Sequence, residues 1–271
     1  MGRSSVTLPP PPNEFFLELE RVPARVLMLD YDGTLAPFRV ERSEARPYPG
    51  VRCALADILR SGRTRLVIVS GRAMDDLAIL LGIEPLPEVW ASHGWERRTA
   101  EGTYRLSQLP EAAKTGLALA ADEARDAGLG PRTETKPAAL ALHWRGMAPR
   151  EVDSLKAWGE AHWGPLSERH GLELHDFDGG LELRPPGVDK GTAVRAVVAE
   201  SRAGALTAYL GDDLTDEDAF KALPAGGLGV LVRGEPRPTA ASAWIRHPEE
   251  LVAFLARWGA VAGGSEHVDT A

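Results

Sequence analysis

The residues of this sequence that could do chemistry begin with two carboxylates, Asp30 and Asp32, which are separated by a single residue. They follow an apolar run over 26–29 without helical spacing, which predicts a buried strand. Gly33 and Thr34 come next, and the glycine allows a sharp turn that exposes backbone N–H groups. Because open α/β sheets bind ligands at the carboxyl ends of their strands, Asp30 could act as a nucleophile and Asp32 as a proton donor and acceptor. The alternative for this segment alone is a surface turn closed by an aspartate side chain.

A calcium-binding loop is a second alternative, because Glu41 is the twelfth residue counted from Asp30. Such a loop needs glycine at its sixth position, where this chain has Leu35, and a helix rather than a strand before it. The sequence therefore excludes a calcium loop.

Two later segments repeat the pattern of an apolar run that ends in polar residues. They are 65–72, which ends in Ser70-Gly71-Arg72, and 207–213, which ends in Gly211-Asp212-Asp213. Amphipathic stretches predict helices over 50–61, 73–81 and 190–201. Alternating segments of these lengths predict an α/β fold, with a parallel sheet covered by helices and the polar strand ends together in one crevice.

The acids around 212–218 indicate a metal site. An acidic first helical turn, favoured by the helix dipole, accounts for Glu217 and Asp218 but not for Asp212, which we expect to face Asp30. Carboxylates this close repel one another unless a hard cation lies among them. Mg²⁺ suits oxygen ligands completed by a substrate phosphate.

The same edge of the sheet carries groups that could bind phosphate. Lys190 begins the helix over 190–201, and a helix start with a lysine can hold an anion, although a solvated lysine is the commoner case. Ser70 and Gly71 offer a hydroxyl and free N–H groups. A hydroxyl donor, a lysine, a metal and a nucleophilic carboxylate are the parts needed for phosphoryl transfer.

The pattern changes between residues 108 and 185, where we expect an inserted α/β domain. Helices opened by proline are predicted over 110–127 and 149–170, and the remaining segments alternate as strands do. Charged side chains share the strand faces opposite the leucines: Glu134, Lys136, Arg145, Glu182 and Arg184. We interpret this domain as a lid whose polar face looks onto the crevice, with a merely solvated sheet face as the alternative.

Composition limits the partners and the compartment. The 271-residue chain has 31 Lys and Arg against 39 Asp and Glu, a net charge of −8, which argues against nucleic acid or an anionic membrane as a partner. Cys53 is the only cysteine, so we expect no internal disulfide, a buried thiol and a cytoplasmic protein. No apolar run reaches the length of a membrane span.

We expect a monomer with a core over 14–107 and 186–262, a lid over 108–185, and flexible tails over 1–13 and 263–271.

Four segments resemble, in order, the four motifs of the haloacid-dehalogenase (HAD) superfamily of phosphatases: Asp30-Tyr31-Asp32-Gly33-Thr34, Ser70-Gly71-Arg72, Lys190 and Gly211-Asp212-Asp213. The resemblance implies a Rossmann-like core in which Asp30 attacks phosphorus to form an aspartyl phosphate. Asp32 would protonate the leaving oxygen and then activate water. Because dehalogenases of this superfamily lack an acid at that position, Asp32 favours phosphate over halide.

The same resemblance implies the roles of the surrounding residues. Mg²⁺ would be bound by the Asp30 carboxylate, the Asp32 carbonyl and Asp212, with Asp213 and Asp216 acting through water. The residues implied to bind phosphate are Gly33, Thr34, Ser70, Gly71, Arg72 and Lys190.

The sequence also resembles the trehalose-6-phosphate phosphatase family over roughly residues 25–255. Further segments carry this likeness: Ala91-Ser92-His93-Gly94, Glu134-Thr135-Lys136, His143-Trp144-Arg145, Leu181-Glu182-Leu183-Arg184-Pro185 and the acidic run 211–217. The resemblance implies that Glu134, Lys136, Arg145 and Glu182 grip the hydroxyls of a small sugar phosphate, trehalose 6-phosphate.

Two residues depart from that family's pattern, and other functions stay open. Asp189 stands where the family often has Asn, and Trp144 where it often has Tyr. We expect His93 and His143 to have structural rather than catalytic roles. The alternatives are a lidded phosphatase for sucrose 6-phosphate or a glycosyl phosphoglycerate, a sugar phosphomutase, and a non-catalytic phosphate-binding relative.

Overall fold

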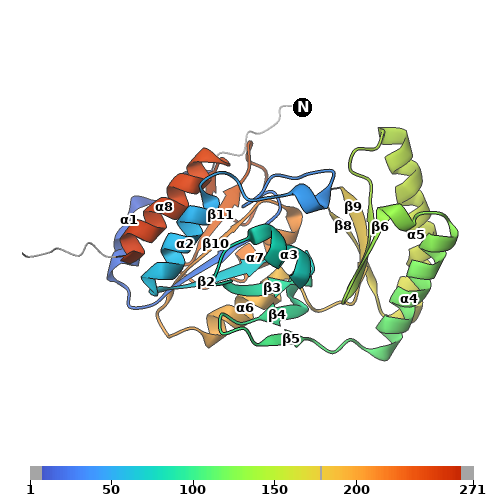
Figure 1. Cartoon of the computed structure of the whole chain (residues 1–271), viewed down its shortest axis with the longest axis horizontal. Helices are drawn as coiled ribbons and strands as arrows, with labels where there is room; N and C mark the ends of the chain where they lie inside the picture. The colour runs from blue at the N-terminus through green and yellow to red at the C-terminus, as the bar shows by residue number, and fades with distance from the viewer. Residues whose placement is uncertain (1–7, 178, 264–271) are drawn as a thin grey trace, which may run out of the picture.

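Two β-sheets, one large and one small, organise the molecule in a computed structural model that describes residues 8–177 and 179–263. The large sheet and its helices lie apart from the small sheet, which has its own two helices (Figure 1). The predicted tails fall largely outside the described residues. In the described part of the first one, the Pro9 carbonyl accepts a hydrogen bond from the Trp244 N–H at 3.0 Å.

The large sheet has the strand order β12-β11-β10-β1-β2-β3-β4-β5. Its first six strands in that order pair in parallel, and β4 and β5 add an antiparallel hairpin. The strands are β1 Arg25–Leu29, β2 Thr64–Val69, β3 Glu88–Ala91, β4 Glu96–Arg98, β5 Tyr104–Leu106, β10 Leu206–Gly211, β11 Leu228–Val232 and β12 Ala243–Ile245. The sequence predicts this parallel sheet, and the structure confirms it.

Helices cover both faces of the large sheet, so the side chains of β1 are buried on both sides. Leu27 and Leu29 pack in one apolar cluster, whereas Val26 and Met28 pack in the other. The first cluster includes side chains from α1 Asn13–Arg21, α2 Val51–Ser61, α3 Met74–Leu81 and α8 Glu249–Gly263, and the second from α6 Lys190–Glu200 and α7 Glu217–Lys221. Short 3₁₀ turns are η1 Arg42–Glu44, η2 Ser92–Gly94, η3 Gly130–Arg132 and η4 Leu214–Asp216. Burial on both faces explains why this strand lacks alternation in the sequence.

The small sheet is antiparallel, with the strand order β6-β7-β9-β8. Its elements are β6 Thr133–Lys136, β7 Ala139–His143, β8 Glu173–Phe177 and β9 Gly180–Arg184, together with α4 Glu111–Asp126 and α5 Pro149–His170. Leu140, Leu142, Leu181 and Leu183 form an apolar core with Trp163 of α5. This sheet lies between its helices and the large sheet, so its other face looks toward the large sheet (Figure 1).

The structure corrects one expectation and adds one strand. Cys53 is exposed, not buried, because α2 packs Val51, Ala54, Leu55 and Ile58 inward and leaves position 53 on the opposite face. The strand β8, whose side chains are exposed or half-buried, is not distinguished by the sequence from the other segments of the small sheet. Across the described ranges, every helix is too short or too polar to cross a membrane.

Candidate active site

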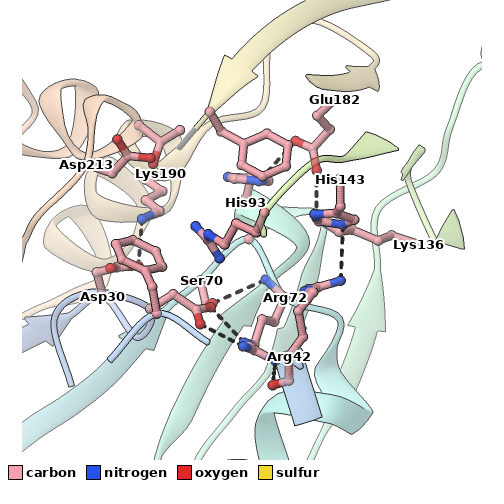
Figure 2. Close-up of a pocket in the computed structure, with 16 residues that line it drawn as sticks. Asp30, Arg42, Ser70, Arg72, His93, Lys136, His143, Glu182, Lys190 and Asp213 are labelled. Atoms are coloured by element: carbon pink, nitrogen blue, oxygen red, sulfur yellow. Dashed lines mark hydrogen bonds and ion pairs between the residues drawn. The ribbon is translucent and has the colours of Figure 1, made fainter. Parts of the chain in front are cut away.

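Asp30 lies directly after β1, where the sheet still holds the backbone. Its N–H donates to the Leu210 carbonyl of β10 at 2.9 Å, which extends the parallel pairing by one residue. The side chain is 3% exposed and lines a pocket at the carboxyl edge of the large sheet (Figure 2). The first predicted strand end therefore delivers a buried carboxylate to a pocket.

Lys190, the first residue of α6, lies against this carboxylate. Its Nζ donates to Asp30 Oδ1 at 2.6 Å and to Asp216 Oδ1 at 2.7 Å. Burial opposes the charge of Lys190, but Asp216 and Asp30 outweigh it and raise the lysine pKa. Burial raises the pKa of Asp30 to about 7, while Lys190 acts to lower it. The lysine thus supplies the charge that can stabilise Asp30 as a carboxylate.

Asp189 explains how Lys190 is placed at the start of α6. The Asp189 carboxylate accepts a hydrogen bond from the Thr192 N–H at 2.7 Å, and the Asp189 N–H donates to Thr192 Oγ1 at 2.7 Å. This arrangement caps the N-terminus of the helix, a role that aspartate and asparagine fill equally well. The departure at position 189 therefore keeps the helix start intact.

Three buried carboxylates gather at the carboxyl ends of β1 and β10. Asp30, Asp212 and Asp216 each offer an oxygen, and these oxygens lie within 4.8 Å of one another. Burial, followed by the charges of Asp30 and Asp216, raises the pKa of Asp212 well above its usual range. Thr34 Oγ1 bridges the group, since it donates to Asp30 Oδ2 at 3.1 Å and to Asp212 Oδ1 at 3.5 Å. A hard divalent cation fits this oxygen donor set because its charge would offset the repulsion.

Asp216 is held in place by several donors. Its Oδ2 accepts the Asp212 and Asp213 N–H groups at 3.0 and 2.9 Å, and its Oδ1 accepts the Tyr209 hydroxyl at 2.6 Å. Asp213 has a different environment, because its carboxylate accepts the Leu214 N–H at 2.7 Å and lines the pocket. Asp213 and Asp216, to which the sequence resemblance gave one shared role, therefore have different hydrogen-bond partners.

Gly33 is needed where the turn after β1 approaches Asp212. Its φ of +83° lies in the left-handed region, and a Cβ built there would come within 2.2 Å of an Asp212 carboxylate oxygen. A side chain at this position would displace Asp212, so glycine is required both for its conformation and for space.

Asp32 and Arg72 form a bidentate pair beside the pocket. Arg72 Nε donates to Asp32 Oδ2 and Nη2 to Asp32 Oδ1, each at 2.7 Å. Arg72 Nη1 also donates to the Arg42 carbonyl at 3.0 Å, and the Arg72 N–H donates to Ser70 Oγ at 3.2 Å. Two parallel hydrogen bonds fix the direction of the Asp32 carboxylate as well as its position.

Charged residues of the small sheet reach the same pocket from the opposite side. Lys136 Nζ donates to Glu182 Oε1 at 2.6 Å and lies 3.8 Å from Glu134 Oε2. The Arg145 guanidinium carbon lies 4.1 Å from the centroid of the Phe38 ring. Of these residues, Lys136, Glu182 and Arg145 line the pocket together with Asp30 and Lys190.

One ion pair and one histidine contact join the small sheet to the large-sheet side of the pocket. Arg42 of η1 pairs with Glu134, and His143 Nε2 lies 3.0 Å from the same carboxylate. His93 Nε2 lies 3.1 Å from Glu182 Oε2. Burial opposes ionisation of Glu134, but hydrogen bonds from His143 and Arg42 and the charge of Lys136 lower its pKa to about 2. Burial likewise opposes ionisation of Glu182, but the charge of Lys136 and the hydrogen bond from His93 hold its pKa well below its usual range, so both carboxylates are ionised and already paired.

The pocket brings together most of the predicted residues but not all of them. Those that line it are Asp30, Asp32, Ser70, Gly71, Arg72, Lys136, Arg145, Glu182, Lys190 and Asp213. Those near it but outside its lining are Gly33, Thr34, Glu134, Asp212 and Asp216. The fully buried Thr34 hydroxyl points to the two carboxylates described above, which differs from the implied contact with phosphate.

Sequence reasoning did not place Phe38, Arg42, Phe177 and Thr215 in the site, and it gave His93 and His143 structural roles. All six residues line the pocket. A signal existed for His93, because it follows β3 at the same sheet edge as the other strand-end motifs. Arg42 carried no such signal, since it lies in a 3₁₀ turn far from any strand end.

Comparisons with known proteins agree with this geometry. The chain is 32% identical over 249 residues to a trehalose-phosphate phosphatase of Mycobacterium marinum, which covers 87% of this chain and 62% of that protein. It is 30% identical over 249 residues to a probable trehalose-phosphate phosphatase of Oryza sativa, covering 86% and 65% of the two chains. The chain thus spans less than two thirds of the length of these curated relatives.

Solved structures share the fold. The C-terminal domain of a Candida albicans trehalose-6-phosphate phosphatase superposes with a TM-score of 0.76 at 21% identity, covering 94% of this chain and 99% of that one. An Aspergillus fumigatus trehalose-6-phosphate phosphatase gives a TM-score of 0.66 at 26% identity, with 93% and 99% coverage. The trehalose-phosphatase family model matches residues 28–243. The match spans most of both sheets and all of the site residues, and the chain belongs to the trehalose-phosphatase family.

Proposed function

We propose that this protein hydrolyses trehalose 6-phosphate to trehalose and phosphate. The observation that carries the proposal is a buried Asp30–Lys190 pair at one wall of a pocket whose opposite wall presents Lys136 and Glu182. One wall suits a phosphoryl group and the other suits hydroxyl groups. A phosphorylated sugar is the class of ligand that needs both.

In this proposal Asp30 is the nucleophile. A carboxylate oxygen of Asp30 attacks phosphorus, the bond from phosphorus to the sugar oxygen breaks, and an aspartyl phosphate forms. Lys190 and Ser70 hold the phosphoryl oxygens, and the Lys190 charge stabilises the negative charge that they carry. Lys190 is suited to this because its Nζ already contacts Asp30 at 2.6 Å.

Asp32 moves the protons in both halves of the reaction. It first donates a proton to the departing sugar oxygen, which leaves as the trehalose hydroxyl. It then takes a proton from a water molecule that attacks phosphorus, which releases phosphate and restores the Asp30 carboxylate. Arg72 keeps the Asp32 carboxyl group directed through its two hydrogen bonds.

Magnesium is the metal that we propose for the three-carboxylate group. Asp30 and Asp212 would hold it, with Asp216 fixed beside them by Lys190 and Tyr209. When bound, the ion supplies positive charge that neutralises the phosphoryl oxygens and the neighbouring carboxylates. Burial and the charges of Asp30 and Asp216 raise the pKa of Asp212 although Lys190 acts to lower it, which supports a need for further positive charge here.

We further propose that residues 14–107 and 186–262 form the catalytic core and that residues 108–185 form a cap over it. In the cap, Glu134, Lys136, Arg145 and Glu182 would bind the sugar hydroxyls. Carboxylates accept from two hydroxyl groups at once, and ammonium and guanidinium groups donate to hydroxyl oxygens. These charges make a disaccharide phosphate a better fit than a small apolar phosphate ester.

Phosphate release from a panel of substrates tests the function. The panel contains trehalose 6-phosphate, sucrose 6-phosphate, a glucosyl phosphoglycerate and p-nitrophenyl phosphate, each with magnesium and with a chelator. We expect the highest kcat/KM for trehalose 6-phosphate and loss of turnover with the chelator. Preferred turnover of another sugar phosphate would refute the substrate assignment, and no release from any of them would favour a non-catalytic relative.

A further inference from the structure

His93 lies on a turn that is tied to the phosphate-binding loop. The turn follows β3, and both Ser92 and His93 have positive φ angles, +48° and +59°. The Ser92 N–H donates to the Arg72 carbonyl at 2.7 Å, and the His93 N–H donates to the Ser70 carbonyl at 2.9 Å. Two hydrogen bonds therefore lock this strained turn onto the Ser70–Arg72 segment.

The imidazole of His93 spans the space between that segment and the cap. A Cβ built on Gly71 would come within 2.4 Å of His93 Nε2 and 2.5 Å of Cε1, so the ring rests directly on the glycine. The same Nε2 lies 3.1 Å from Glu182 Oε2 of β9. His93 is thus a core residue that touches both the proposed phosphate site and a cap carboxylate.

The charge state of His93 determines which hydrogen bond the ring can donate to Glu182. Burial lowers the pKa of His93 to about 4, against the opposing charge of Glu182, so the ring is neutral near pH 7. A carboxylate only accepts hydrogen bonds, so we assign the single ring proton to Nε2. Nδ1 is then an acceptor, and it has no hydrogen-bond partner within the described ranges. The polar contact that holds this ring is therefore the one with Glu182.

We propose that His93 is a positioning residue for recognition of the sugar, which acts by aiming the Glu182 carboxylate when the cap is closed. Lys136 Nζ holds one carboxylate oxygen at 2.6 Å, and His93 Nε2–H holds the other. A carboxylate with one donor on each oxygen keeps one orientation, which a vicinal pair of hydroxyls requires. Since His93 also rests on Gly71, the orientation of Glu182 is set by the same loop that receives the phosphate. This inference rests on the proposed function.

Three substitutions separate this role from a purely structural one. His93→Ala removes the donor, His93→Gln keeps an amide donor near the position of Nε2, and His93→Asn places its amide near Nδ1 instead. Asparagine also tolerates the positive φ of this residue better than most residues do. The His93→Asn variant is therefore the control for the backbone, and thermal melting of each variant reports the fold.

The measurement is kcat/KM on trehalose 6-phosphate and on p-nitrophenyl phosphate. For His93→Ala and His93→Asn we expect the loss on the sugar phosphate to exceed the loss on the aryl ester by about tenfold or more, the scale of one hydrogen bond to a charged group. His93→Gln should recover most of this difference. If Asn restores sugar-phosphate turnover as well as Gln does, or if both substrates suffer equally, the proposal is wrong.

A double-mutant cycle tests whether His93 acts through Glu182. In a Glu182→Ala background, His93→Ala should change kcat/KM on trehalose 6-phosphate by less than about twofold, because the carboxylate that it positions is gone. Additive losses would overturn the proposal while leaving the proposed function standing. A wild-type protein that hydrolyses only p-nitrophenyl phosphate would overturn the proposed function, and this inference with it.

Discussion

Replacement of Lys190 by methionine should destabilise the protein far more than an ordinary surface change. The Lys190 side chain is 4% exposed, and its Nζ contacts buried Asp30 and Asp216 at 2.6 and 2.7 Å. Methionine keeps the length of the side chain but leaves the two carboxylates without their shared cation. Breaking a buried ion pair by removing one partner costs about 3–5 kcal/mol of unfolding free energy.

The assay is urea unfolding followed by circular dichroism, with a chelator present so that no metal replaces the lost charge. Lys221→Met is the matched control, because that lysine is 65% exposed and lies 3.6 Å from Asp218. An exposed pair of this kind contributes about 0–1 kcal/mol, so this variant should unfold almost as the wild type does. Both variants lose one positive charge, but Lys190 is buried between two carboxylates and Lys221 is exposed beside one.

The pH dependence of the Lys190→Met deficit provides a second check. The folded-state pKa of Asp30 is raised to about 7, above its value of 3.8 in an unfolded chain. A group with a raised pKa favours the folded state at low pH, and this contribution is lost as the pH rises through 7. The deficit should therefore shrink from about pH 8 toward about pH 5 as Asp30 takes up a proton. A deficit below about 1 kcal/mol at the higher pH would refute the reasoning about the buried pair.

Three other predictions concern catalysis and the metal. Asp30→Asn and Asp32→Asn should each lose nearly all phosphate release while staying folded, and substantial turnover by Asp30→Asn would exclude covalent catalysis through that residue. Glu182→Ala should lower kcat/KM for trehalose 6-phosphate about tenfold more than for p-nitrophenyl phosphate, and equal losses would mean that this cap contact is misassigned. Millimolar Mg²⁺ should raise the melting temperature more at about pH 8 than at about pH 5, because Asp30 and Asp212 must be ionised to bind it; the same increase at both values would argue against these ligands.

The residues at strand ends were predictable because topology alone brings them together. Once 26–29 and 207–210 are recognised as parallel strands, their carboxyl ends must lie at the same edge of the sheet. The side chains of Asp30 and Asp212 are therefore expected to lie close together at that edge. Alternation along β9 likewise predicted that Glu182 and the flanking leucines lie on opposite faces, as they do.

Other features depended on three-dimensional contacts that no local pattern encodes. Arg42 reaches Glu134 only because the loop after β1 extends to the small sheet. The pairing of Asp32 with Arg72 depends on two strand ends that lie 40 residues apart. Cys53 was predicted wrongly from its residue type, although the helical spacing of its neighbours would have placed it on the outer face.

The pairing of Glu134 and Glu182 with side chains from across the pocket also bears on affinity. Glu134 and Glu182 already have cationic or donor partners across the pocket, Arg42 and His93, so a sugar must exchange one set of polar partners for another. Such an exchange adds little to the binding free energy, since the hydroxyls of the ligand also lose their hydrogen bonds to water. The charged phosphoryl end should then supply most of the attraction, and cleavage of that end would turn a retained ligand into one that departs readily.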